Sequence, residues 1–392
     1  MKGEKVFNTK NYNLFVLLEF ALSAVIILST LLIRPGITSK AFALSFITLF
    51  VAVFRCCFKR KTKLFGLMLI ITVGALFCVC CSTLIMGGTL SYEYLKEYII
   101  FISTILLMYY AVNTKINANT TLFLLKFNVI ISFLYPVAYR FFPLHDKFND
   151  LALNFSNPNL AGMWILLSIL YCALAFFALK KVLWKIISIV SVALNVFLIL
   201  QTKARNCFIS LFLFLILLAW LNIKKSNRLS KAVVLIVNIL PIVFVPLYLQ
   251  LIDPIIKKGW FSFLVSSGKN LTSRVTIWNR VLNELDVYWF TGAYPKTAGN
   301  AHNSHLVVLA SYGIIILIAV IAFTTLVSNT LNNKLTCKQQ AYALVAFFAT
   351  LFLGFGEGAL FSGGQGIYIM ICGFILLANG NYPQDILKTT TQ

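Results

Sequence analysis

The sequence predicts an all-α, polytopic integral membrane protein with about twelve transmembrane helices and one large extracytoplasmic loop, in a single domain over residues 1–392. Three observations predict this class. Hydrophobic residues make up 60% of the chain and charged residues only 11%, whereas a soluble domain has about a quarter of its residues charged. Apolar runs of roughly 17–25 residues, long enough to span a bilayer, recur from one end to the other. Only residues 251–302 interrupt them with a long, more polar stretch.

Each expected span is an apolar run closed by charged, glycine-containing or proline-containing connections. Arg34-Pro35-Gly36 closes the first run, which is too long for the core of a cleavable signal, so we expect it to be kept. The expected spans are 13–33, 41–58, 64–86, 96–113, 121–139, 160–179, 186–202, 206–223, 232–250, 303–329, 339–356 and 366–380.

The basic residues predict the orientation of these spans. When both termini are placed in the cytoplasm, most of the 33 lysines and arginines fall in short cytoplasmic connections. Such a bias is the usual signal for the cytoplasmic side. We therefore expect a bacterial cytoplasmic (inner) membrane protein with residues 251–302 outside the cytoplasm.

The net charge of +22 does not indicate a nucleic-acid partner, because it is spread over short connections that set topology. The nine cysteines lie mostly within spans or at the cytoplasmic side, so no disulfide framework is expected. Cys78-Val79-Cys80-Cys81 has no histidine or carboxylate nearby in sequence, which favours apolar packing over a metal site.

Four polar features fall on the extracytoplasmic side in this topology. Asn157-Pro158-Asn159 opens the sixth span, and Thr202 to Asn206 links the seventh and eighth. The large loop runs into His302-Asn303, and the glycine-rich segment 354–366 joins the last two spans. Because separate connections converge on one side, we expect the active site there.

Arg205 lies at the start of an apolar run. A helix N-terminus favours anions through its free N–H groups and dipole, and a guanidinium matches two phosphate oxygens. This pattern indicates a phosphate site with Lys203 beside it. The alternative is that both side chains only reach toward the membrane interface.

Residues 272–289 have apolar positions at helical spacing, which is typical of an amphipathic helix lying along the membrane. Arg274 falls in its first turn, and Arg280 follows later in the same helix. These arginines face either the mouth of the bundle or the lipid headgroups, and the sequence favours neither.

His302 and His305 lie three residues apart, so we expect them to share a helical face. A zinc site needs a third ligand, and only Glu357 or Asp286 offers one, so we expect no metal. A single histidine, His302, working as general base is the simpler hypothesis; a histidine that merely bonds a loop carbonyl is the alternative. Glu357, near membrane depth, would brace an arginine or His302, or would itself serve as the base.

The chain contains no Asp-x-Asp pair and no glycine-rich phosphate loop ending in Gly-Lys-Ser/Thr. We therefore expect chemistry that uses no nucleotide, metal or other cofactor.

Taken together, these motifs resemble those of the O-antigen polymerase/O-antigen ligase superfamily of bacterial envelope glycosyltransferases. His302-Asn303, separated by nine residues from Gly313, matches the family's last motif. Thr202 to Arg205 matches its Thr-x-x-Arg segment, Arg274 to Trp278 its Arg-x-x-x-Trp segment, and Asn157 to Asn159 its Asn-Pro-Asn. The similarity covers roughly residues 150–380, and Lys203 departs from it where the family often has a small residue.

The resemblance implies a GT-C-like fold and transfer of a glycan from an undecaprenyl-diphosphate-linked oligosaccharide. Arg205 and Arg274 would neutralise the leaving diphosphate, and His302 would orient or deprotonate the attacking hydroxyl. We favour a polymerase acting on a lipid-linked repeat unit, possible partners being a chain-length regulator or other assembly proteins. The alternatives are a ligase that transfers the glycan to lipid A–core or another acceptor and, less favoured, a flippase or transporter of lipid-linked oligosaccharide. The expected substrate contacts are Asn157, Asn159, Lys203, Arg280, Asn303, His305 and Glu357.

Overall fold

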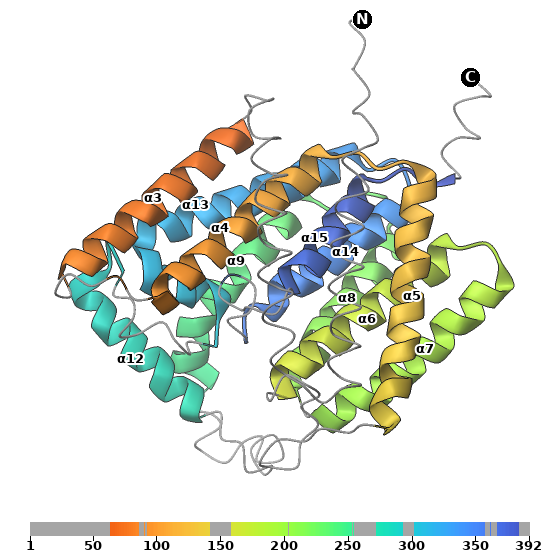
Figure 1. Cartoon of the computed structure of the whole chain (residues 1–392), viewed down its shortest axis with the longest axis horizontal. Coiled ribbons are helices and arrows are strands. Elements are labelled where there is room, and N and C mark those ends of the chain that lie inside the picture. Colours follow the sequence, from red (N-terminus) through yellow and green to blue (C-terminus); the bar gives the residue numbers. More distant parts are fainter. Residues whose placement is uncertain are drawn as a thin grey trace, which may run out of the picture.

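The computed structural model describes residues 63–85, 90, 92–141, 158–202, 204–252, 254, 272–292, 302–356, 361 and 367–383. Throughout these residues the chain forms helices and no strand (Figure 1). The helices are α3 Lys63–Ile85, α4 Tyr92–Asn113, α5 Ala118–Phe141, α6 Pro158–Ala178, α7 Val182–Thr202, α8 Arg205–Ile223, α9 Lys231–Leu247, the π-helical turn η3 Tyr248–Ile252, α12 Thr272–Tyr288, α13 Ser304–Lys334, α14 Lys338–Leu353 and α15 Ile367–Asn379.

Each expected span from 64–86 onward coincides with one of these helices. Seven described helices are long and apolar enough to cross a membrane, as in a multi-pass membrane protein. The expected spans 13–33 and 41–58 lie outside the described residues. Because α4, α14 and α15 offer only shorter apolar stretches, a total of twelve spans stays a prediction.

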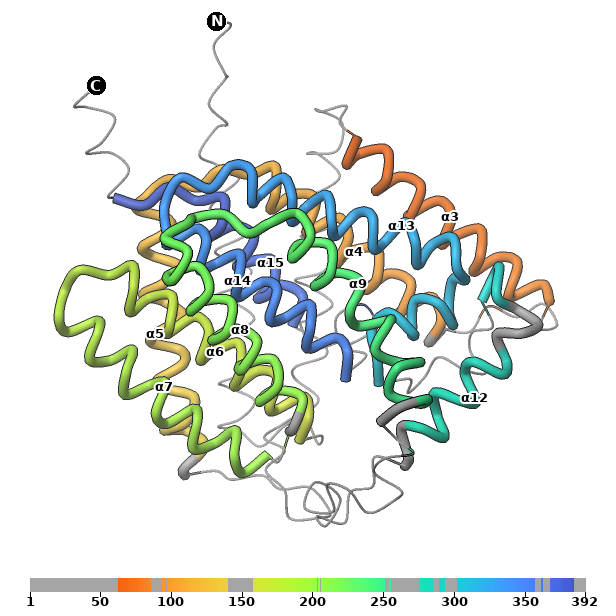
Figure 2. Tube along the Cα trace, turned by 180° about the vertical axis from the view of Figure 1, so that it is seen from behind, coloured from red at the N-terminus to blue at the C-terminus, as the bar shows by residue number. Residues whose placement is uncertain are grey.

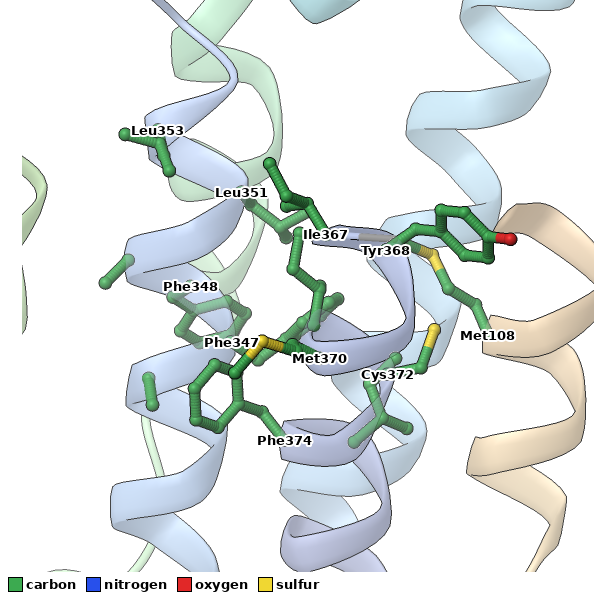
Figure 3. Packing of buried hydrophobic residues seen from close by; sticks show 14 of the residues in the cluster. Met108, Phe347, Phe348, Leu351, Leu353, Ile367, Tyr368, Met370, Cys372 and Phe374 are labelled. Carbon is green, nitrogen blue, oxygen red and sulfur yellow. The ribbon is translucent and has the colours of Figure 1, made fainter. Parts of the chain in front are cut away.

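The core lies around α14 and α15. Every residue of α15 is buried, and so are nearly all those of α14. A helix that is apolar on all sides is kept from water either by lipid or by other helices, and here other helices surround α15. Figure 3 shows Phe347 and Phe348 of α14 near Met370 and Phe374 on one side of α15, and Met108 of α4 on the other side.

Peripheral helices differ sharply from these two. Only 33% of the most apolar window of α3 and 28% of that of α7 is buried. Their outer faces carry exposed large apolar side chains such as Phe77 and Phe197. Surfaces of this kind suit contact with lipid chains rather than with water.

The two central helices are short. At 1.5 Å per residue, α14 with 16 residues and α15 with 13 are about 24 and 20 Å long, against roughly 30 Å for a bilayer core. The turn that ends α14, residues 354–356, is buried. Non-helical backbone at such depth is tolerated where protein surrounds it, so this turn lies recessed within the bundle.

The amphipathic helix expected at 272–289 is α12. Val275, Trp278 and Val281 are buried at helical spacing, while Thr276 and Arg280 are exposed. Figures 1 and 2 show α12 at the edge of the bundle, running across the direction of the other helices. This placement matches a helix that covers one end of the bundle rather than crossing the membrane.

Candidate functional site

The recessed turn Gly354–Gly356 fixes the start of α13. The backbone N–H of Ser304 donates to the carbonyl of Gly354 at 2.7 Å. The amide Nδ2 of Asn303 donates to the carbonyl of Phe355 at 2.9 Å. Two bonds from adjacent residues therefore set the position of the α13 N-terminus, and with it that of His302.

The same turn also fixes the start of α8. Asn206 Nδ2 donates to the carbonyl of Gly356 at 3.1 Å. A Cβ atom at Gly356 would collide with the Asn206 amide, so only glycine allows this approach. The backbone of Arg205, the first residue of α8, is held beside the turn; its side chain and Lys203 lie outside the described structure.

Helix α6 packs against the link that precedes α8. A Cβ atom at Gly162 would collide with Ala204 and would lie 3.1 Å from Cys207 Sγ and 3.2 Å from Thr202 Oγ1. Asn159, half-buried in the first turn of α6, lies one turn before this contact. Asn157 lies outside the described residues.

Trp278 joins α12 to the same turn. Its side chain is 1% exposed, and its ring lies 6.1 Å from that of Phe355 and 5.6 Å from that of Tyr248. The backbone of Arg274 lies one helical turn earlier, and its side chain is outside the described structure. Arg280 is exposed on the opposite face, away from the turn.

The expectation that His302 and His305 share a helical face is wrong. Helix α13 begins at Ser304, and His302 lies before it with a left-handed backbone at φ 47°. This conformation is uncommon outside glycine and often marks functional positions. His302 is partly exposed, whereas His305 is only 2% exposed and lies edge-on to Phe361 at 5.9 Å.

Asn303 is the N-cap of α13 and is fully buried. Its Oδ1 accepts from the N–H of Leu306 at 2.8 Å, and its Nδ2 donates to the carbonyls of Pro241 and Phe355. With oxygen and nitrogen both bonded within the protein, the Asn303 side chain fixes the backbone that follows His302.

Gly313 interrupts α13. Its dihedral angles of 77° and 179° are non-helical and fall in a region open essentially to glycine alone. The expected continuous span 303–329 is therefore two helical segments, 304–312 and 314–334. The second, with 21 residues at 1.5 Å each, is about 31 Å long and long enough to cross a bilayer core by itself.

Among the described residues, no group of three histidine, cysteine or carboxylate side chains could hold a metal ion. Glu357, expected to brace the site, follows Gly356 directly and lies outside the described structure. Whether the chemistry proceeds without metal stays a prediction.

Sequence reasoning assigned no role to Asn206 and did not foresee that the turn Gly354–Gly356 accepts bonds from two helices. An asparagine at the start of an otherwise apolar helix was the available signal, because a buried amide there needs partners. The expected positions Arg205, Arg274, Asn159 and His302 all belong to elements that contact this turn or their immediate neighbours.

No protein-family model matches this chain, and no curated protein matches it. What the chain does must therefore be inferred from its own residues and from their arrangement around the recessed turn.

Proposed function

We propose that this protein is a polysaccharide polymerase of the bacterial cell envelope. It transfers a glycan from an undecaprenyl-diphosphate-linked donor to a lipid-linked repeat unit at the outer face of the cytoplasmic membrane. One observation carries the proposal: the turn Gly354–Gly356 ties together the elements that carry Arg205, Arg274 and His302.

Positive electrostatic potential supports an anionic substrate here. The N-termini of α8 and α13 lie beside the turn, and each contributes a partial positive charge. Arg205 at the start of α8 and Arg274 in the first turn of α12 add full charges. This combination suits a diphosphate, whose charge rises when it becomes the leaving group.

The proposed reaction needs one base and one anion site. A hydroxyl of the acceptor sugar attacks the anomeric carbon of the donor, and its proton passes to His302. The bond from this carbon to the diphosphate oxygen breaks, and the diphosphate leaves with the electron pair. The arginines neutralise that charge, so the energy of transfer comes from the donor alone.

Depth in the membrane also supports a lipid-linked substrate. The turn ends α14, whose 16 residues are too few to cross the bilayer core. A diphosphate attached to a membrane lipid sits at headgroup depth and could reach a recessed site while its polyprenyl tail stays among lipid chains. A soluble sugar donor would gain nothing from this depth.

A deletion strain with defined glycans tests the function. Loss of a polymerase leaves a single repeat unit on the final acceptor, and wild-type protein restores the long chains whereas His302→Ala does not. Long chains stranded on undecaprenyl diphosphate would instead identify a ligase. Accumulation of repeat units on the cytoplasmic side would identify a flippase and overturn the proposal.

A further inference from the structure

Residues Trp289 to Gly292 enter the break in α13. The N–H of Ile314 donates to the carbonyl of Trp289 at 2.9 Å, which replaces a bond that the interrupted helix lacks. Gly292 has φ 78° and Gly313 has φ 77°. The segment that follows α12 is thus bonded by its backbone into a transmembrane helix. We call this segment, residues 289–292, together with the break at Gly313, the latch.

Neighbouring helices occupy the other polar groups that the latch exposes. The carbonyls at the break and in the segment accept bonds from α3 and α4: Tyr312 from Cys78 at 3.1 Å, Ser311 from Tyr94 at 3.1 Å, and Gly292 from Ser82 at 3.3 Å. In Figures 1 and 2 one end of α12 lies beside the C-terminal end of α3, in agreement with these bonds. The latch therefore joins α3, α4, α12 and α13.

Both glycines are required by close backbone contact. A Cβ atom at Gly313 would collide with the carbonyl of Phe290, and one at Gly292 would lie 2.6 Å from the carbonyl oxygen of Ser311. Backbone atoms do not move aside as side chains do. A methyl group at either position must therefore separate the segment from the helix.

We propose that the latch is a positioning device that holds α12, with Arg274, against the segment of α13 that begins beside His302. This inference rests on the proposed function. Tyr288 ends α12 directly before the latch, and residues 304–312 form a rigid helix between Gly313 and His302. The closed latch sets the spacing between the diphosphate site and the base, and an open latch leaves the donor site incomplete.

The population of the closed latch sets the apparent donor affinity. When only one state can bind the ligand, the apparent dissociation constant equals the intrinsic one divided by the fraction of protein in that state. A smaller closed fraction therefore gives weaker donor binding. The donor, by engaging Arg274 of α12, draws the latch closed. Opening should therefore raise the donor KM and leave kcat nearly unchanged, whereas a partly unfolded protein would show a lower kcat at unchanged KM.

Gly313→Ala is the test variant, and Gly66→Ala in α3 is its control because a Cβ atom at Gly66 meets nothing within 4 Å. Both are made in a chain whose only cysteine is Cys78, purified and reconstituted in nanodiscs. Alkylation of Cys78 by a small maleimide reports opening, since its thiol is buried against Tyr312. We expect Gly313→Ala to speed alkylation of Cys78 and to raise the KM for the undecaprenyl-diphosphate-linked donor, each by about tenfold or more. Saturating donor should again protect Cys78 from alkylation in this variant.

Two milder variants keep the test decisive if Gly313→Ala does not fold. Tyr94→Phe and Ser82→Ala each weaken the latch without adding an atom, and each should raise the alkylation rate of Cys78 by about fivefold, the weight of one net hydrogen bond. Donor KM should rise less in these two variants, because the closed latch stays the dominant state. Wild-type alkylation rates in both mild variants would overturn the inference, and so would a Gly313→Ala protein with rapid alkylation at an unchanged KM or with a raised KM and Cys78 still protected. A wild-type protein that forms no polymer would refute the proposed function, while the alkylation contrast would still decide whether the latch exists.

Discussion

Replacement of Asn303 by alanine should both loosen the bundle and silence the site. The variant loses the helix cap to Leu306 and the two bonds to the carbonyls of Pro241 and Phe355. A lost cap costs about 1 kcal/mol, and each buried carbonyl left without its donor costs about 1 kcal/mol or more. Because Asn303 is fully buried, water does not replace these partners, and the total is about 3 kcal/mol.

Thermal unfolding of the reconstituted protein measures this cost. A loss of about 3 kcal/mol should lower Tm by roughly 5 °C or more, and polymer formation should fall because His302 loses its anchor. Asn238→Ala is the matched control: Asn238 is also buried and also joins α9 to α13, through Ser328, but its bonds lie away from the turn. If both variants showed equal Tm and equal activity, the positioning role of Asn303 would be refuted.

Three further predictions follow from the proposed site and topology. Arg205→Lys and Arg274→Lys keep the charge but lose the planar, two-point hydrogen bonding to phosphate. Because a hydrogen bond to a charged group is worth about 1.5–3 kcal/mol, each variant should cut polymer formation about tenfold or more. Normal glycan at normal protein level would contradict this. His302→Ala should leave the protein folded and slow glycan transfer by a factor of about 10² to 10⁴. The wild-type protein should keep its activity in EDTA. Loss of activity on chelation, with recovery when zinc is added, would exclude the metal-free mechanism. Single cysteines should react from outside the cell in the loop 254–300 and only from the cytoplasm in 224–231, and the reverse pattern would place the site in the wrong compartment.

The helices could be predicted closely because each is an apolar run bounded by charged or helix-breaking residues. Amphipathic spacing identified α12 for the same reason, since buried positions such as Trp278 and Val281 recur with the helical period. The grouping of Arg205 and His302 at one end followed from topology alone. These features depend on local composition, which the sequence displays directly.

The features that were missed depend on contacts between distant segments. The apolar pattern continues on both sides of Gly313, so nothing local indicates that Trp289 bonds to Ile314 across the break. The pairing of His302 with His305 failed because it assumed a helix through both residues. Asn303 caps α13 through its Oδ1, and the bonds from its Nδ2 to carbonyls on α9 and on the recessed turn could not be read from the local sequence.

The short, fully buried α15 bears on how the protein is assembled. Its 13 residues are too few to span a bilayer core, so lipid alone gives it no stable transmembrane state. It needs the groove that α4, α6 and α14 provide, and those helices precede it in the chain. Insertion of α15 is therefore expected to follow the packing of the earlier helices, and a variant that widens this groove would fail during biogenesis rather than during catalysis.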